Sequence, residues 1–336
     1  MTAPLTVGFV TNRLSLRGTE TVLWTYAHYN EVMLGNRSLI FVNSKRDIII
    51  EPHNREDNCE EAKEWFINRF EQVHFCSTNE IEQKMKDAGV DVCFIELAGV
   101  DSDWVPTGVP SVLHCVFQPL HKGTVSTAIS TCVGKGKIPV LPNIMPSHHT
   151  TDDMREELDI PKDAVVFGRY GGYNQFSINY AKDAVRHVAA VHPDIYFVFM
   201  NTAQFMEPAK NVIFLPGTRD MYKKQRFINT CDAYLHARED GETFGAAIGE
   251  FALSNKNIVT TKDQNGQQNE HLDILGDKCI RYEDYNSLVN ILENYISHKK
   301  DMMENGYYMY TPEKIIPKFG EFINEAVRLH HERHGS

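Results

Sequence analysis

The segment that decides the fold reads AVVFGRYGGYNQFSINYAKDAVRHVAAVHPDIYFVFM and covers residues 164–200. It opens with a continuous apolar run, continues with apolar residues at helical spacing up to Pro193, and closes with a second apolar run. Continuous apolar strands are typical of parallel sheets covered on both faces, and parallel strands need a long crossover between them. The segment therefore predicts a strand–helix–strand unit of an α/β protein.

Runs of the same two kinds alternate along the whole chain. We expect strands at residues 5–11, 38–42, 73–76, 91–96, 110–116, 138–142, 164–170, 195–200, 211–215, 232–236, 257–261 and 278–282. We expect helices at residues 19–34, 150–160, 177–192, 243–254 and 284–296, and a helix pair broken by Pro317 at 311–334. This order predicts the α/β class with two Rossmann-like α/β/α domains.

A proline-rich and polar stretch, LPNIMPSHHTTDD, divides the chain near its middle at residues 141–153. We therefore predict a first domain at residues 1–150 and a second at 151–310. A final helix at 311–336 is expected to cross back to the first domain. Ligands of open α/β sheets bind at the carboxyl ends of the strands, so two such domains predict a site in the cleft that they face.

Composition excludes several classes of function. The net charge of -11 over 336 residues argues against nucleic acid as a partner. No apolar run approaches the ~20 residues of a transmembrane helix, and the start of the chain lacks a basic leader. Scattered cysteines without a C-x-x-C pair predict reduced thiols in a cytoplasmic protein, without disulfides or a metal. The sequence leaves a homodimer open.

Two loops that follow expected strands carry features of anion sites. In TNRLSLRGTE (11–20), Gly18 permits a close approach, and the N–H groups of Thr19 and Glu20 would lie at a helix start. In RYGGYNQFS (169–177), Arg169 is expected to bind a phosphate beside the accessible backbone of Gly171. A plain turn is the alternative for each loop, and the chain lacks a G-x-G-x-x-G dinucleotide fingerprint.

The stretch GETFGAAIGE (241–250) places Glu242 and Glu250 at the two ends of an apolar segment. A buried carboxylate is costly unless it has a partner. Either protein donors or a ligand rich in hydroxyl groups must therefore meet these two side chains. We expect Thr243 and Phe244 to present N–H groups at the start of the helix. A capping glutamate and an exposed helical glutamate are the structural alternative.

The segment GETFGAAIGEFALSNKNIVTT (241–261) resembles the E-x7-E segment of retaining GT-B glycosyltransferases, glycosyltransferase family 4 in particular, including members encoded by large DNA viruses. Other segments are similar to the family in the same order along the chain. They are TNRLSLRGTE, PSVLHCVF, IPVLPN, VVFGRY and FLPGTRDMYKKQRFINTCDAYLHAREDGETFG. The resemblance covers most of the chain, is sharpest over residues 213–261 and is weak over residues 45–90.

The resemblance implies roles for individual residues. Glu242 would face the donor sugar and His114 would lie near the sugar and the acceptor, so these two are the expected catalytic residues. Glu250 would accept hydrogen bonds from the ribose. The other residues expected to bind the nucleotide-sugar are Gly18, Thr19, Arg169, Gly171, Gly217, Thr218, Arg219, Thr243, Phe244 and Gly245.

The implied activity is a retaining, metal-independent transfer of a hexose to a hydroxyl of a glycan or glycoprotein, without a cofactor. GDP-mannose or UDP-glucose would be the donor, with a lean to GDP-mannose. One departure is that the family's second phosphate-binding lysine is missing from residues 173–176. A catalytically silent nucleotide-sugar-binding protein is therefore one alternative. A metal-dependent transferase that uses Asp101 and Asp103 is another, and a nicotinamide-dependent enzyme is a third.

Overall fold

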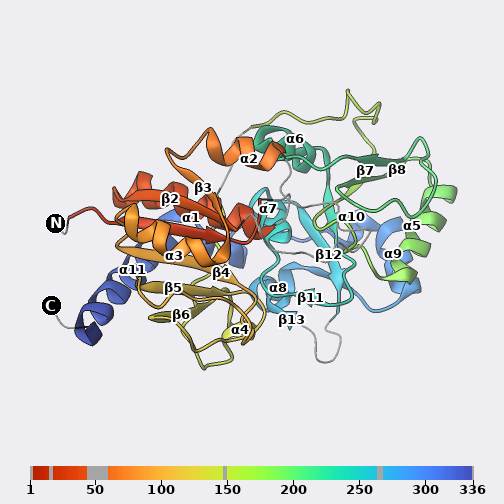
Figure 1. Cartoon of the computed structure of the whole chain (residues 1–336). Coiled ribbons are helices and arrows are strands. Elements are labelled where there is room, and N and C mark those ends of the chain that lie inside the picture. The colour runs from red at the N-terminus through yellow and green to blue at the C-terminus, as the bar shows by residue number, and fades with distance from the viewer. Residues whose placement is uncertain (1–2, 15–17, 44–59, 147–149, 263–267, 335–336) are drawn as a thin grey trace. The chain divides into compact units, whose positions relative to one another are not determined.

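The structure is a computed structural model that describes residues 3–14, 18–43, 60–146, 150–262 and 268–334 (Figure 1). The chain divides into two compact units, Met1–Pro146 with Tyr310–Ser336, and Ser147–Met309. Each unit is built on a parallel six-stranded sheet, with helices in many but not all of the connections between successive strands. The predicted fold class, with two Rossmann-like α/β domains, is confirmed.

The first unit contains a sheet in the order β3-β2-β1-β4-β5-β6. Its strands are β1 (Thr6–Thr11), β2 (Arg37–Asn43), β3 (Val73–Cys76), β4 (Val92–Leu97), β5 (Ser111–Cys115) and β6 (Val125–Ala128). The strand order reverses between β1 and β4, since the chain moves outward from β1 through β2 to β3 and then continues on the other side of β1 with β4. Such a switch point is the usual ligand position in an open α/β sheet.

Helices α1 (Gly18–Leu34), α2 (Glu60–Ile67), α3 (Thr78–Asp87), α4 (Thr131–Gly134) and α11 (Pro312–His334) complete the first unit. Helix α11 packs against α1 and strands β4 to β6. The core between them contains the rings of Phe9, Tyr26, Phe94 and Phe319, which contact one another at centroid distances of 5.0–6.1 Å. The last helix of the chain is therefore part of the first hydrophobic core.

The second unit contains a sheet in the order β14-β12-β10-β7-β8-β9. Its strands are β7 (Val165–Tyr170), β8 (Ile195–Met200), β9 (Val212–Leu215), β10 (Ala233–Leu235), β12 (Asn257–Thr261) and β14 (Ile280–Tyr282). Its helices are α5 (Asn179–Val191), α6 (Met221–Thr230), α7 (Ala246–Leu253), α8 (Glu270–Leu275), α9 (Tyr285–Glu293) and α10 (Tyr295–His298). A short parallel pair, β11 (Gly241–Glu242) and β13 (Gln268–Asn269), lies apart from the main sheet.

The strand expected at 138–142 is wrong, and β6 takes its place. Pro139 and Pro142 lack the N–H groups that a ladder requires, so this run contributes only an isolated bridge from Val140 to Ala128. Strand β6 has few apolar residues, but it pairs in parallel with β5, and the hydroxyl of Thr127 donates to the carbonyl of Leu113 at 2.8 Å. Tertiary pairing therefore decides between the two segments.

Two expected helices also differ. Residues 150–160 form turns, because Asp159 takes a φ of 53° and the N–H of Ile160 closes back on the carbonyl of Arg155. In contrast, α11 continues through Pro317 without a break. Pro317 lies on the exposed face of α11, where water can replace the helical hydrogen bond that its ring removes.

The remaining expectations about the chain as a whole concern cysteines and membranes. Cys76, Cys93, Cys115, Cys132, Cys231 and Cys279 are free thiols, as expected, and Cys59 lies outside the described residues. Among the described residues, no helix has both the length and the apolar character needed to cross a bilayer.

Candidate functional site

The carboxylate of Glu242 lies just beyond the carboxyl end of β10. Gly241 takes a φ of 69°, and a Cβ there would lie 2.1 Å from the carbonyl oxygen of Gln268, so only glycine allows the pairing of β11 with β13. The Glu242 side chain, 19% exposed, makes an ion pair with Arg238 at 3.0 Å between Oε2 and Nη1. Its Oε1 lies 3.4 Å from Nε2 of His236.

These neighbours keep Glu242 ionised. Burial raises the pKa of Glu242, but His236 and the charge of Arg238 outweigh burial and lower this pKa to about 2. Behind the carboxylate, Nδ1 of His236 lies 2.9 Å from Oγ1 of Thr260, which lies 3.1 Å from Nε2 of His271. Burial, followed by the charge of His236, lowers the pKa of His271 to about 3, so this ring is neutral at pH 7. Glu242 is therefore a fixed anion that can accept hydrogen bonds or balance a positive charge.

The second carboxylate, Glu250, belongs to α7 and is 13% exposed. Its Oε1 lies 2.6 Å from Nζ of Lys224 on α6, and this ammonium also lies 5.4 Å from the ring centroid of Tyr170. The other oxygen, Oε2, is buried and has no hydrogen-bond partner among the described residues. Leaving such an atom unpaired is costly, so Oε2 is placed to accept a hydrogen bond from a ligand.

Both carboxylates lie near Tyr234 of β10. The hydroxyl of Tyr234 donates to the carbonyl of Tyr170 at 2.7 Å. Burial raises the pKa of Tyr234, and this pKa is also influenced by Arg169, Glu242 and Glu250. Three charges expected from the sequence, those of Arg169, Glu242 and Glu250, are therefore close enough to one buried tyrosine of the second sheet to influence its pKa.

Arg169 is buried, and its Nη1 donates to the carbonyl of Asn201 at 3.1 Å and to Oγ1 of Thr202 at 2.7 Å. Its Nη2 donates to the carbonyl of Gly172 at 2.7 Å. The guanidinium thus holds the loops that follow β7 and β8, and its expected contact with a phosphate stays a prediction. Burial lowers the pKa of Arg169 but leaves a positive charge near Glu242.

Helix α7 begins at Ala246, after Thr243 and Phe244, whose N–H groups we expected at its start. Gly245 takes a φ of 77° immediately before Ala246, and a Cβ there would lie 3.0 Å from the hydroxyl oxygen of Tyr307. The carbonyl of Phe244 accepts a hydrogen bond from that hydroxyl at 2.7 Å. Thr243 and Phe244 therefore precede the helix, and Glu242 lies in β11, so the two glutamates do not share one helical segment.

The other expected contacts follow strands of the same sheet. The carbonyl of Gly171 accepts from Nδ2 of Asn201 at 2.8 Å, after β7. Gly217, Thr218 and Arg219 follow β9, where Oγ1 of Thr218 accepts from the N–H of Asp220 at 3.0 Å. Their roles toward a nucleotide stay predictions.

His114 contradicts its expected role. It is 0% exposed, and its Nε2 donates to the carbonyl of Leu141 at 2.8 Å inside the first core. Its ring contacts Tyr26 and Phe94 at centroid distances of 5.6 and 5.1 Å. Burial lowers the pKa of His114 to about 4. The residue is therefore a neutral part of the core rather than a group that meets the sugar or acceptor.

We expect His114→Gln to change the acid stability of the protein. Because the folded pKa lies below the ordinary value of ~6.5, the unfolded chain binds the proton more tightly, and stability falls between pH 6.5 and pH 4. Glutamine can donate to Leu141 without titrating. Between pH 7 and pH 4, the variant should therefore lose about 3 kcal/mol less unfolding free energy than the wild type. Urea unfolding at both pH values measures this, and equal losses would contradict it.

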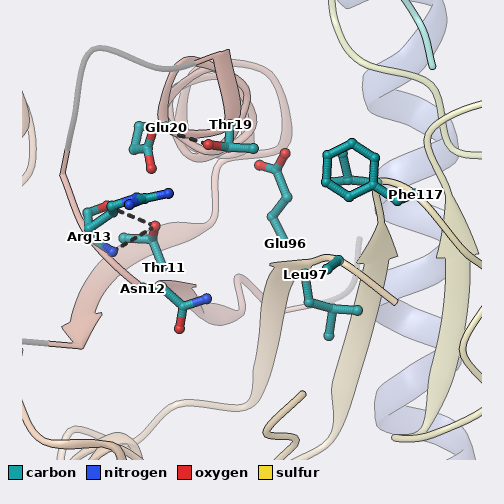
Figure 2. Close-up of a pocket in the computed structure, with 10 residues that line it drawn as sticks. Thr11, Asn12, Arg13, Thr19, Glu20, Glu96, Leu97 and Phe117 are labelled. Carbon is teal, nitrogen blue, oxygen red and sulfur yellow. Dashed lines mark hydrogen bonds between the residues drawn. The ribbon is translucent and has the colours of Figure 1, made fainter. Parts of the chain in front are cut away.

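Thr19 lines a pocket of the first unit, of about 370 Å³, at the carboxyl ends of β1, β4 and β5 (Figure 2). Gly18 begins α1, and Oγ1 of Thr19 donates to Oε2 of Glu20 at 3.0 Å. Glu96, at the end of β4, points into the same space. The sequence reasoning did not select Glu96, because a single glutamate at the end of an apolar strand carries no motif.

Asp101 and Asp103 do not form a metal site with neighbouring ligands. Oδ2 of Asp103 accepts from the N–H groups of Gly99 and Val100 at 2.8 and 2.9 Å, as in an ordinary turn. Within the described ranges, no group of three or more histidine, cysteine, aspartate or glutamate residues is placed to hold a metal ion.

Comparison with solved structures identifies the fold. HepE (Alr3699) from Anabaena, solved with UDP and glucose, matches with a TM-score of 0.69 at 14% identity, over 95% of this chain and 99% of that chain. A glycosyltransferase from Rickettsia africae matches with a TM-score of 0.68 at 13% identity, over 97% and 99%. WaaG, a glycosyltransferase involved in lipopolysaccharide biosynthesis, matches with a TM-score of 0.62 at 12% identity, over 94% and 99%. No family model and no curated protein sequence matches the chain.

The protein therefore has the GT-B fold over nearly its whole length.

Proposed function

We propose that this chain is a glycosyltransferase whose donor, a nucleoside diphosphate sugar, binds at the carboxyl edge of the second sheet. The observation that carries the proposal is the buried, unpaired Oε2 of Glu250, held in place by the ion pair with Lys224. A ribose offers vicinal hydroxyl groups that such an oxygen accepts. The glycosyltransferases that share the fold, one of them solved with UDP-glucose, support the same assignment.

In this proposal each charged side chain contacts a different part of the donor. Glu250 accepts from the ribose, and the fixed anion Glu242 accepts from sugar hydroxyls and stabilises positive charge on the ring. Lys224 and Arg219 are buried cations close enough for the charge of Arg219 to affect the pKa of Lys224. They supply positive charge near the diphosphate, in place of the family's lysine that residues 173–176 lack. Lys224 stays charged, because Glu250 more than offsets the lowering of its pKa by burial.

The proposed reaction is a metal-independent transfer of a hexose with retention. The bond from the anomeric carbon to the β-phosphate oxygen breaks, and the electron pair leaves with the nucleoside diphosphate. The acceptor oxygen forms its bond on the same face of the sugar, and its proton passes to the departing phosphate. Glu242 stabilises the positive charge that develops on the sugar ring while the first bond breaks and the second forms. GDP-mannose and UDP-glucose are the donors proposed, with a lean to GDP-mannose.

We expect the wild-type protein to bind GDP-mannose or UDP-glucose and to release the nucleoside diphosphate slowly without an acceptor. Calorimetric titration of both donors measures binding, and detection of free GDP or UDP measures cleavage. Binding without any release would favour the catalytically silent alternative. Release that a chelator abolishes would favour a metal-dependent transferase, and binding of NAD in place of both donors would overturn the proposal.

A further inference from the structure

Three buried polar side chains form a connected array that leads away from the carboxylate of Glu242. Nε2 of His236 lies 3.4 Å from Oε1 of Glu242, and Nδ1 of the same ring lies 2.9 Å from Oγ1 of Thr260. This hydroxyl lies 3.1 Å from Nε2 of His271, and the two imidazole rings contact each other at a centroid distance of 4.9 Å. His236, Thr260 and His271 are all buried, so bulk water does not reach the array.

The single proton of the Thr260 hydroxyl gives this array a direction. A hydroxyl donates one hydrogen bond and accepts others, so Oγ1 of Thr260 donates to one of the two rings and accepts from the other. Burial is the main cause that lowers the pKa of His271 to about 3, so this ring carries one N–H at pH 7. Two arrangements therefore remain, and they differ in which nitrogen of each histidine carries a proton.

In the first arrangement, Nε2 of His271 donates to Thr260, and Thr260 donates to Nδ1 of His236. The proton of His236 is then on Nε2, next to the carboxylate of Glu242. In the reverse arrangement, a neutral His236 turns a lone pair toward this anion.

Protonating both nitrogens of His236 removes that conflict but creates another. Nδ1 of His236 would then donate to Thr260, which in turn would donate to Nε2 of His271. The remaining proton of His271 would be on Nδ1, which is buried and has no hydrogen-bond partner among the described residues. In native proteins, buried N–H groups without an acceptor are rarer than under-satisfied acceptors. The first arrangement is therefore favoured on both counts.

We propose that Thr260 and His271 are positioning residues that fix His236 as the neutral Nε2–H tautomer, with this N–H directed at Glu242. A neutral donor orients the carboxylate without cancelling its charge. The distance of 3.4 Å is longer than a full hydrogen bond, and such contacts commonly tighten when a substrate binds. The effect on sugar transfer rests on the proposed function, whereas the tautomer is a property of the protein alone.

Nitrogen NMR of the full-length protein with isotope-labelled histidine tests the tautomer, because the chemical shift of a ring nitrogen shows whether it carries a proton. At pH 7, we expect His236 and His271 each to be protonated on Nε2 and not on Nδ1. His236→Gln and His271→Gln identify the signals by their loss. Thr260→Val removes the donor to Nδ1 and should leave His236 in a mixture of tautomers, whereas Thr260→Ser should restore the wild-type pattern. A cationic His236, or a neutral one protonated on Nδ1, would overturn the proposal.

Steady-state kinetics of the Thr260 variants tests the positioning role. Thr260→Val should lower kcat about 10- to 100-fold with little change in KM for the donor, as loss of a partner that orients a histidine typically does. Thr260→Ser should stay near the wild-type rate. An unchanged kcat in Thr260→Val would overturn the positioning role.

The matched control is Thr127→Val, which removes a buried hydroxyl of the first unit that donates to the carbonyl of Leu113. This variant should change neither the tautomers nor kcat, so it separates the loss of a buried threonine hydroxyl in general from the loss of the one at Thr260. A wild type that shows the expected tautomers but cleaves no donor would support the tautomer assignment and count against the proposed function. A wild type that transfers sugar with a cationic His236 would overturn the tautomer assignment alone.

Discussion

Replacing Glu242 with glutamine is expected to lower the rate of sugar transfer about 100- to 1,000-fold, with a small change in donor affinity. The variant keeps the size of the side chain but removes the anion that His236 and Arg238 hold ionised. That anion acts most strongly when the sugar ring becomes positive, so its loss should affect kcat more than KM. Steady-state kinetics with the donor identified by calorimetry measures both quantities.

The matched control for Glu242→Gln is Glu239→Gln. Glu239 is an exposed glutamate of the same loop, and its N–H donates to Oγ of Ser177 without involving the carboxylate. The Glu239→Gln variant should transfer sugar at the wild-type rate. Glu242→Gln leaves Arg238 without its closest carboxylate, so thermal unfolding of the variant must also be measured. A folded Glu242→Gln protein with an unchanged kcat would contradict the role of Glu242.

Replacing Glu250 with glutamine is expected to weaken donor binding about 10- to 100-fold, since hydrogen bonds to charged groups contribute about 1.5–3 kcal/mol. Oε2 of Glu250 is the buried acceptor to which a hydroxyl of the proposed ribose donates. The variant also deprives the buried ammonium of Lys224 of its partner, which lowers stability and complicates a simple comparison of affinities. Calorimetry with UDP-glucose or GDP-mannose gives the first measurement.

A cycle with 2′-deoxy donors isolates the ribose contact from the effect on Lys224. The wild type should bind a 2′-deoxy donor at least tenfold more weakly than the ribose donor. Glu250→Gln should discriminate between the two donors far less, because the accepting anion is gone in both complexes. If the variant keeps the full wild-type discrimination, the ribose lies elsewhere and Glu250 has only a structural role.

Several strands could be predicted from apolar runs in the sequence. Strands β1, β7 and β8 were predicted in this way, because strands buried on both faces are mostly apolar. The apolar run at 138–142 did not form a strand, because its two prolines lack the N–H groups of a ladder. The apolar pattern did not predict β6, whose residues form a strand only through pairing with β5. Continuation of the helix through Pro317 was not predicted either, since the effect of a proline depends on which face of the helix it occupies.

The site was predictable in part. Glu242 and Glu250 stood out as carboxylates at the ends of an apolar segment, and in the structure the charges of both influence the pKa of Tyr234. Lys224 could not be found, because Lys223 and Lys224 are adjacent in sequence and only the fold leaves one half-buried and buries the other. His114 was misassigned for the same reason, since a histidine near a strand end can face a ligand or the core.

A crystal structure of the protein with UDP-glucose or GDP-mannose would locate the donor directly. We expect a ribose hydroxyl within ~3 Å of Oε2 of Glu250 and the hexose against Glu242. A nucleotide bound away from the carboxyl edge of the second sheet, with the Glu250–Lys224 pair intact and its second oxygen still unpaired, would contradict it.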